Sequence, residues 1–254
     1  MSTNGTSLEP GAPIRFRWSS SSLSVPGNVR KVNEDSVLDL PASGVWVVAD
    51  GMGGHNAGDV ASRMIVETLS EVRPAERPSQ FVDEIEDRVR RVNRTLYEGS
   101  LTSGGGLCGS TIVVVAAFAN YVACLWAGDS RVYRLRGGKL AQITRDHSEL
   151  EELVDQGRQA EATAASNVIT RAVGGTEDVA LDIELCELAD GDQFLLCSDG
   201  LYRELTDEDI AAQLARTPAD ASQAMIEQSL RGTCADNVSV ITVRFTRPAG
   251  ATDR

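Results

Sequence analysis

The sequence predicts an α+β fold: two antiparallel sheets packed face to face with a pair of helices outside each, a four-layer α-β-β-α sandwich. Short alternating or apolar runs separated by turn residues are numerous, which is typical of antiparallel strands. Two pairs of helical patterns interrupt these strands, one in the first half of the chain and one near its C-terminal end. The 254 residues are enough for one large core, and no long linker divides them.

The strands are predicted from period-two alternation and from apolar runs that stop at Gly, Asn or Asp. Residues 14–20 alternate apolar side chains with arginines, whereas residues 19–26 resemble a turn. The run TIVVVAAFA, residues 111–119, is apolar on both faces, which is typical of a central strand covered on both sides. Short loops at 119–120, 128–130 and 137–138 predict hairpins. The predicted strands are 14–20, 36–40, 45–49, 110–118, 121–127, 131–135, 140–144, 181–188, 193–198 and 237–246.

The helices are predicted from apolar residues at i, i+3 and i+4 spacing. Residues 57–72 and 79–98 each carry such a stripe, and prolines separate the two. Residues 147–157 also look helical. Thr206 precedes a run of acids and is expected to cap a helix, and Pro218 is expected to open a last helix that Gly232 ends.

The two ends of the chain differ in composition from the rest. Residues 1–13 are polar and rich in Ser, Gly and Pro, so we expect a disordered leader, one domain over 14–246 and a loose tail over 247–254. The start lacks the basic and apolar regions of a signal peptide, and no run is long and apolar enough to span a membrane. The five cysteines are widely spaced with no CxxC pair, so we expect a cytoplasmic protein.

The net charge of −13 argues against a nucleic-acid or anionic-membrane partner, because both need basic surfaces. A site that processes phosphate would then need local positive charge from an arginine or from metal ions. The sequence carries no oligomerisation signal that we recognise, so a monomer is the default expectation.

The chain is organised around residues 45–58, VWVVADGMGGHNAG, where a short apolar strand ends abruptly in Asp50-Gly51. One isolated Asp-Gly is most often an ordinary turn. The arrangement recurs, however: acids beside small residues also border strands as Asp129 in LWAGD, Asp199 in LLCSDG, Asp236 in CADNVSV and Asp35 in NED. This recurrence predicts several carboxylates held at sheet edges.

If these five acids converge, they cannot all stay ionised without cations. Carboxylate oxygens suit hard divalent ions such as Mg²⁺ or Mn²⁺, with Ca²⁺ as a weaker rival. With two histidines in the chain, a zinc or facial-triad iron site is hard to build. Gly51 has no side chain, so its carbonyl could approach an ion closely. Two ions about 4 Å apart would acidify a bridging water and clamp a phosphoryl oxygen.

Arg30 lies a few residues before Glu34-Asp35 and could make a forked contact with a phosphate. A surface salt bridge is an equally good interpretation of this arginine. Other catalytic motifs do not fit. GMGGHNAG has Asn56 where a dinucleotide-binding loop needs its third glycine, and the chain has neither a Walker A lysine nor a nucleophile elbow.

A series of motifs nevertheless occurs in a recognisable order: RKVNED, VVADGMGGHNAG, GST, GDSRVYRLRGGKL, TRDHS to LVDQG, NVITRAVG, LLCSDGL and ADNVSVI. This ordered set resembles the PPM-type (type 2C) metal-dependent protein serine/threonine phosphatases in their compact bacterial form. The resemblance covers about Arg15 to Phe245, nearly the whole chain. It implies a fold of two central antiparallel sheets flanked by helix pairs, in agreement with the pattern of strands and helices.

The resemblance implies that Asp50, Asp199 and Asp236 are catalytic metal ligands. Asp50 would bridge two ions, Mn²⁺ or Mg²⁺, with the Gly51 carbonyl on one of them. Asp199 and Asp236 would complete the shell of the first ion. A water or hydroxide bridging the two ions would then attack phosphoserine or phosphothreonine directly, without a phospho-enzyme.

The remaining roles are also implied by the resemblance. Asp35 would belong to the second ion's shell, with Glu34 acting through water. Asp129, together with Asp199, would hold a third and weaker ion. Arg30 matches the arginine that binds the substrate phosphate.

Two departures from the family pattern bear on these roles. Met52 stands where eukaryotic relatives have a histidine proposed as general acid, so the proton donor is open and His55 is a candidate, although packing in the turn is the commoner role for such a histidine. Residues 158–167 match a mobile flap beside the site but lack the His-Pro often found there. Flaps vary with substrate, so this departure concerns specificity.

The sequence therefore predicts a phosphoprotein phosphatase that opposes a Ser/Thr kinase. One alternative is a catalytically idle domain of the same family that serves as a signalling module, but such a domain would have lost metal-binding acids. Another alternative is a phosphatase for a single regulatory partner. Members of the family that accompany bacterial secretion systems also consist of a single stand-alone domain, which suggests a secretion-system context for this protein.

Overall fold

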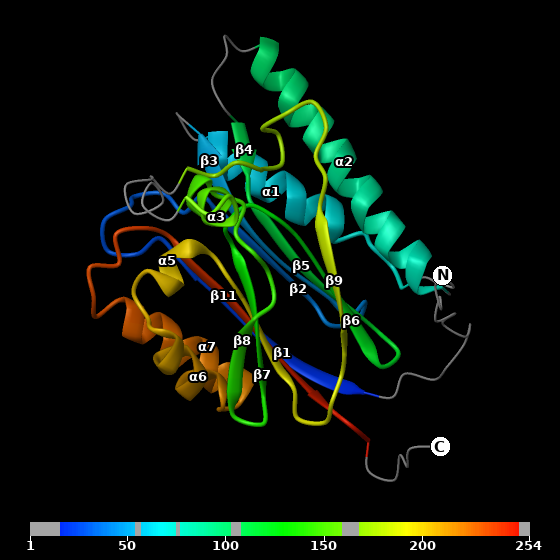
Figure 1. Ribbon diagram of the computed structural model, residues 1–254, viewed down its shortest axis with the longest axis vertical. Coiled ribbons are helices and arrows are strands. Elements are labelled where there is room, and N and C mark those ends of the chain that lie inside the picture. The colour runs from blue at the N-terminus through cyan, green and yellow to red at the C-terminus, as the bar shows by residue number, and fades with distance from the viewer. Residues whose placement is uncertain (1–15, 54–56, 75–76, 103–107, 159–167, 249–254) are drawn as a thin grey trace.

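Two antiparallel sheets lie face to face at the centre of the computed structural model, which describes residues 16–53, 57–74, 77–102, 108–158 and 168–248 (Figure 1). The first sheet has the order β1 (Arg17–Val25), β11 (Val238–Thr246), β10 (Gln193–Cys197), β7 (Arg131–Arg136) and β8 (Lys139–Gln142). The second has the order β2 (Asp35–Leu40), β3 (Val45–Gly53), β5 (Ile112–Phe118), β6 (Tyr121–Ala127) and β9 (Asp182–Glu187), and the short β4 (Cys108–Ser110) pairs with the end of β3.

Helices cover both outer faces of this pair of sheets. The helices of the described residues are α1 (Ala57–Leu69), α2 (Pro78–Thr102), α3 (Glu149–Asp155), α5 (Asp199–Tyr202), α6 (Asp207–Leu214) and α7 (Pro218–Ser229). Figure 1 shows α1 and α2 over the second sheet, and α6 and α7 over the first. The predicted four-layer α-β-β-α sandwich is confirmed. Among the described residues, none of the helices combines the length and apolar character that a membrane crossing needs.

Three hydrophobic cores separate the four layers, and the alternation of the strands fills them. In β3, Val45 and Val47 face α1 and α2, whereas Trp46 and Val48 face the other sheet. In β10, Phe194 and Leu196 point into the space between the sheets, while Leu195 points toward α5, α6 and α7. Because neighbouring side chains enter different cores, the central strands are apolar on both faces, as the sequence predicts for β5.

β1 is longer than the sequence predicts. A turn is expected over residues 19–26, but β1 continues to Val25, with Arg17 opposite Thr246 and Val25 opposite Val238 in β11. The hydroxyls of Ser24 and Ser239 lie 2.7 Å apart across this pair. Pairing with a long neighbouring strand therefore overrides the weak strand propensity of a serine-rich segment.

The loop at residues 128–130 is not a hairpin, in contrast to the sequence prediction. β6 lies between β5 and β9 in one sheet, and β7 lies between β10 and β8 in the other. Gly128 has φ of 109°, and a Cβ there would lie 2.6 Å from the Thr111 side chain. The chain therefore crosses between the sheets at this loop, and Asp129 lies in the crossing. The predicted hairpins β5–β6 and β7–β8 are confirmed.

The start of α6 follows the capping prediction. Thr206 accepts a hydrogen bond from the Asp209 backbone N–H at 3.2 Å, and the Asp209 carboxylate accepts one from the Thr206 N–H at 3.3 Å. This reciprocal pair is a capping box, in which Asp209 takes the place usually held by Glu or Gln. Two backbone donors that the helix itself cannot satisfy are thereby paired.

We expect Thr206→Ala to lower the free energy of unfolding by about 1 kcal/mol, because it removes this cap. Thr206→Ser keeps the hydroxyl and should retain most of the stability. Urea unfolding followed by circular dichroism measures both variants. Equal stability of the alanine and serine variants would show that the cap contributes nothing here.

Candidate active site

The five acids singled out in the sequence lie at strand ends on one edge of the sandwich. Asp35 begins β2 and lies directly opposite Asp50 in β3. The other three belong to connections: Asp129 follows β6, Asp199 begins α5 just after β10, and Asp236 precedes β11. The charges of the other four acids all act on Asp50. The structure therefore brings the predicted set together from both sheets.

Burial and mutual repulsion raise the pKa of Asp35, Asp50, Asp129 and Asp199. The pKa of Asp50 lies well above its usual range because burial disfavours its charged form and four other acids repel it. Burial raises the pKa of Asp35 to about 6 and that of Asp129 to about 6, with repulsion from Asp199 added in both cases. Burial also raises the pKa of Asp199. The acids thus form a site that is short of positive charge.

The backbone around Asp50 is held by the residues between β4 and β5. The Asp50 carbonyl accepts hydrogen bonds from the Thr111 N–H and the Ser110 hydroxyl, both at 2.9 Å. The Asp50 N–H donates to the Thr111 hydroxyl at 3.2 Å, and that hydroxyl lies 2.7 Å from the hydroxyl of Ser130. These contacts explain why the predicted strand 110–118 is interrupted at Thr111. They also tie Asp50 to the loop that carries Asp129.

Gly51 and Gly58 allow the end of β3 to approach the start of α1. A Cβ on Gly51 would lie 2.1 Å from the Gly58 carbonyl oxygen and 2.6 Å from that of Glu34. The Glu34 carbonyl accepts hydrogen bonds from the Gly51 N–H at 3.1 Å and from the Ser62 hydroxyl at 2.6 Å. Any side chain at position 51 would therefore force these backbones apart and displace the neighbouring Asp50.

Asp35 is held from the opposite sheet. Ser198 donates a hydrogen bond to Asp35 Oδ2 at 2.7 Å, whereas Asp35 Oδ1 is buried with no hydrogen-bond partner among the described residues. Asn237 accepts from the Glu34 N–H at 2.9 Å and donates to the Val32 carbonyl at 3.0 Å. The segment around residues 32–35 is thus fixed against the strand that follows Asp236.

Arg30 lies on the exposed rim of the site and pairs with Asp236. Its Nε and Nη2 lie 3.0 Å and 3.1 Å from the two carboxylate oxygens of Asp236, so the contact is forked. About half of the Arg30 side chain is exposed. The arginine can therefore leave Asp236 for an incoming anion without breaking a buried contact.

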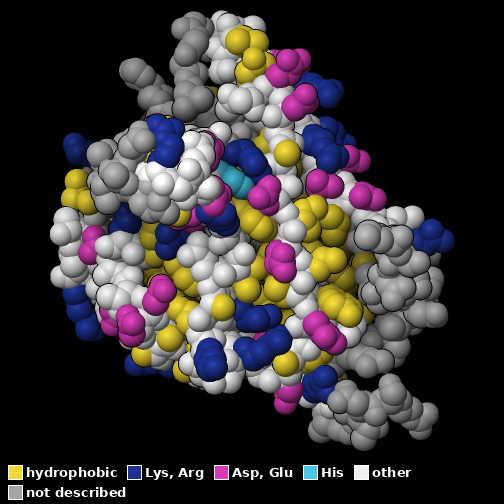
Figure 2. Space-filling model, viewed as in Figure 1, with side chains coloured by type: hydrophobic (Ala, Val, Ile, Leu, Met, Phe, Trp, Pro, Cys, Tyr) yellow, Lys and Arg dark blue, Asp and Glu magenta, His cyan; other side chains and the backbone are white. Residues whose placement is uncertain are grey.

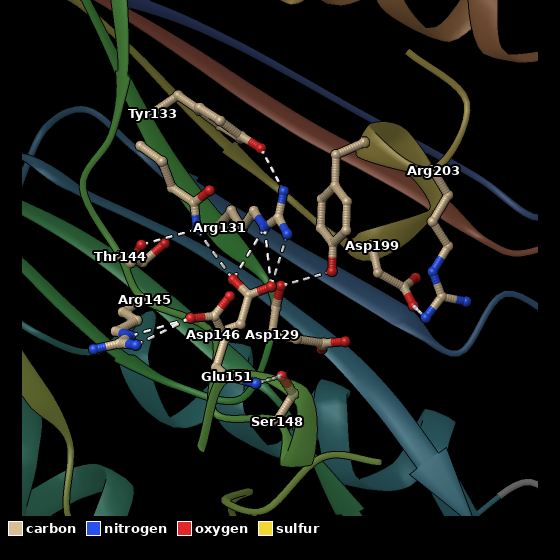
Figure 3. Close-up of polar contacts among 12 residues, drawn as sticks. Asp129, Arg131, Tyr133, Thr144, Arg145, Asp146, Ser148, Glu151, Asp199 and Arg203 are labelled. Carbon is tan, nitrogen blue, oxygen red and sulfur yellow. Dashed lines mark hydrogen bonds and ion pairs between the residues drawn. The ribbon is translucent and has the colours of Figure 1, made fainter. Parts of the chain in front are cut away.

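A network that the sequence did not predict supports the loop around Asp129 (Figure 3). Arg131 makes a bidentate pair with Asp146, at 3.0 Å and 2.8 Å, and donates to the Tyr133 hydroxyl at 2.9 Å. Its guanidinium carbon lies 3.6 Å from the centre of the Tyr202 ring. The Tyr202 hydroxyl donates to the Asp129 carbonyl at 2.9 Å. Arg131 belongs to the GDSR motif and Asp146 to the DHS motif. The sequence shows both motifs, but only the folded chain shows that the two side chains pair.

The donor set fits hard divalent cations. It consists of carboxylates, and Oδ1 atoms of both Asp35 and Asp129 are buried without a hydrogen-bond partner among the described residues. Among the described residues, no group of three or more His, Cys, Asp or Glu side chains is arranged so that it could hold a metal ion. Two of the acids pair with arginines instead, Asp236 with Arg30 and Asp199 with Arg203. Cation binding would have to replace these ion pairs.

The two features named as departures are only partly visible. Met52 lies in β3 next to the site and pairs with Gly109 across to β4. His55 and most of the flap segment, residues 159–167, lie outside the described residues. The predicted leader, residues 1–13, also lies outside them, as do residues 249–254 of the tail.

The second histidine, His147, supports the Asp129 loop. Its Nδ1 accepts a hydrogen bond from the Gly128 N–H at 3.1 Å, and its ring stacks on Trp126 with centroids 6.2 Å apart. Nε2 lies 3.2 Å from an oxygen of Asp182, which also pairs with Arg171. An accepting Nδ1 requires the neutral ring, and burial lowers the pKa of His147, which Asp182 partly offsets.

The comparisons with known proteins identify the family of this chain. The family model for protein phosphatase 2C matches residues 29–233, so the chain belongs to the protein phosphatase 2C family. The chain is 35% identical over 226 residues to the serine/threonine protein phosphatase PstP of Mycobacterium tuberculosis, covering 85% of this chain and 42% of that protein. It therefore spans less than half the length of PstP. It is 32% identical to the serine/threonine phosphatase stp of Listeria monocytogenes, covering 85% of this chain and 92% of the relative.

Solved structures give the same result at the level of the fold. The chain superposes on PppA of Pseudomonas aeruginosa, described as a key regulatory component of T6SS, with a TM-score of 0.84, 41% identity, and coverage of 90% of this chain and 97% of that one. It superposes on the catalytic domain of PstP in complex with 2 manganese ions with a TM-score of 0.82, 33% identity, and coverage of 91% and 99%.

The environment of His147 leads to a prediction about pH. Because its pKa is lowered in the folded state, the neutral ring stabilises the fold above about pH 6.5, the ordinary pKa, and this contribution is lost as the pH falls. We expect His147→Gln, which cannot be protonated, to lose less stability than the wild type between pH 7 and pH 5. Urea unfolding at both pH values measures this, and equal losses in the two proteins would contradict it.

Proposed function

We propose that this protein is a metal-dependent phosphatase that hydrolyses phosphoserine and phosphothreonine in proteins and so opposes a Ser/Thr kinase. One observation carries the proposal: five acids from both sheets meet at one edge, beside an exposed arginine that forks onto one of them. Membership of the protein phosphatase 2C family supports it, as do relatives named serine/threonine phosphatases.

In this proposal Asp50 holds two divalent ions, Mn²⁺ or Mg²⁺. Asp199, Asp236 and the Gly51 carbonyl belong to the same metal centre. Asp35, with Glu34 through water, completes the second position, and Asp129 with Asp199 takes a weaker third ion. The two manganese ions in the PstP structure support a site of this kind. The raised pKa of Asp50 gives the physical reason, because a nearby cation would favour the ionised carboxylates that burial and repulsion disfavour.

When bound, the ions would supply Lewis-acid chemistry, which would make a water more acidic and neutralise charge on the phosphoryl group. The chain's own residues would prepare this step. Arg30 would exchange its contact with Asp236 for a forked contact with the substrate phosphate. Ser198 would hold the Asp35 carboxylate, and Thr111 and Ser110 would keep the Asp50 backbone in place.

The partners follow from this activity. We infer that its substrates are phosphorylated proteins and that it acts together with a cognate kinase system. We also infer that residues 14–246 form one domain, that the protein is cytoplasmic and that it is a monomer. Figure 2 shows acidic and basic side chains interspersed on the face in view, which together with the net charge of −13 speaks against nucleic-acid or membrane binding. The similarity to PppA favours, as a second candidate, a phosphatase that regulates one partner system. The sequence retains all the acids that the family resemblance assigns to the metal centre, which weighs against an idle signalling module.

Hydrolysis of p-nitrophenyl phosphate with Mn²⁺, with Mg²⁺ and with EDTA tests the proposal, followed by release of phosphate from a phosphothreonine peptide. We expect turnover with either ion and none with EDTA. EDTA removes the divalent ions, and the carboxylates that remain cannot neutralise the charge of the phosphate. Turnover that persists in EDTA would contradict metal dependence. Metal binding without turnover on either substrate would support the idle-module alternative.

We expect Asp50→Asn and Asp236→Asn to keep the fold and to lower activity roughly 100-fold or more, because each removes a charged oxygen ligand. Asp87→Asn is the matched control, since this exposed acid on α2 pairs with Arg90 away from the strand-end acids. Turnover is measured at saturating Mn²⁺, and circular dichroism checks the fold. Full activity of either site variant would contradict the two-metal assignment.

A further inference from the structure

Arg203 places a fixed positive charge beside two of the proposed metal ligands. It follows α5 and lies one helical turn after Asp199, with its Nη2 2.7 Å from Asp199 Oδ2. Figure 3 shows the side chains of Asp199 and Arg203 facing each other, with Asp129 in the same region of the site. Neither the family motifs nor the sequence pattern drew attention to this arginine.

Asp129 lies near the same guanidinium, and the opposite charges of Arg203 and Asp129 attract each other. Asp129 is 4% exposed, and its Oδ1 has no hydrogen-bond partner among the described residues. The hydroxyl of Tyr202, the neighbour of Arg203, fixes the Asp129 carbonyl. The Arg203 guanidinium therefore lies near two buried carboxylates, those of Asp199 and Asp129. The Oδ1 atom of Asp129 has no hydrogen-bond partner among the described residues and could accept a cation.

We propose that Arg203 is a tethered cation that competes with a divalent ion for Asp199 and Asp129. It would stabilise this pair of acids when the third metal position is vacant and would have to move away before an ion could bind there. The inference rests on the proposed function, because that proposal assigns the third ion to the same two acids. It adds a reason, present in this chain, why an ion held by Asp129 and Asp199 would bind weakly.

The way Arg203 is held makes such an exchange possible. Its side chain is 43% exposed, and among the described residues its one ion pair is the contact with Asp199. Arg131 is the contrasting case nearby. It is bound to Asp146 and Tyr133 and stacked on Tyr202, so its release would break several contacts at once. Arg203 can swing into solvent at the loss of one partly exposed ion pair.

Titration of the metal-free protein with Mn²⁺ tests the inference, with unbound Mn²⁺ measured by electron paramagnetic resonance. Four proteins are compared: the wild type, Arg203→Ala, Arg203→Lys and Arg90→Ala. Arg90 is the matched control, because it is an exposed helical arginine paired with an acid four residues earlier, on α2. Circular dichroism checks that each variant folds, and the lysine variant retains a cation at the position.

We expect Arg203→Ala to bind its weakest class of Mn²⁺ roughly fivefold to tenfold more tightly than the wild type, since a partly exposed ion pair no longer competes. Arg203→Lys should lie close to the wild type, and Arg90→Ala should match it. In the Arg203→Ala background, Asp129→Asn should abolish the tightened class, which assigns that class to Asp129.

An unchanged or weaker third class in Arg203→Ala would overturn the inference, as would an equal tightening in Arg90→Ala. Hydrolysis of p-nitrophenyl phosphate by the wild type is measured in parallel and separates the two proposals. Turnover without the expected shift would overturn the role of Arg203 alone. The expected shift without turnover would overturn the proposed function and leave the role of Arg203 supported.

Discussion

Mutual repulsion among buried carboxylates is the constraint on which the rest of this structure depends. Five acids act on one another at one edge of the sandwich, and burial alone already disfavours their charged forms. Such a group relaxes by moving apart unless rigid elements hold it. Here the acids are attached to strands of two sheets, and three tightly packed cores fix those strands relative to one another. The hydrophobic layers therefore hold these acids near one another despite their repulsion.

The chain compensates part of this repulsion in two different ways. Hydroxyls hold individual acids or their backbone, as Ser198 does for Asp35 and Thr111 does for Asp50. Two arginines, Arg30 and Arg203, neutralise acids from the exposed rim. The hydroxyls are buried and fixed, whereas both arginines are about half exposed and so can exchange partners. A site built in this way is held in place without being closed, which is what the proposed binding of ions and of a phosphorylated segment requires.

The connection at Gly128–Ser130 links the fold to the site. Its glycine conformation and close packing on Thr111 let the chain leave one sheet and enter the other. Thr111 then contacts Ser130 from the same loop and the backbone of Asp50 from the neighbouring strand. Arg131, Asp146, Tyr202 and His147 hold the loop from its other side. The position of Asp129 is therefore the result of a crossing between layers and not of a local turn.

Local patterns predicted much of this molecule correctly. The alternation in β3 and β5 identified central strands, and the residues around Thr206 predicted a helix start, because such patterns depend on near neighbours in the chain. Predictions that depend on partners far away in sequence failed. The serines of β1 form a strand because β11 pairs with them, and the short loop at residues 128–130 crosses between sheets because β7 finds its partners in β10 and β8.

The same division applies to the site. The sequence by itself singled out the five acids that the structure brings together, because each stands next to a strand and small residues whatever the strand order. It also pointed to Arg30, although it left open a role in phosphate binding or in a surface ion pair. Only the tertiary structure decided that these acids meet, that Arg30 forks onto Asp236, and that Arg203 faces Asp199 and Asp129. The physical reason is that electrostatic interactions depend on distances between chain segments, and packing of the two sheets sets those distances.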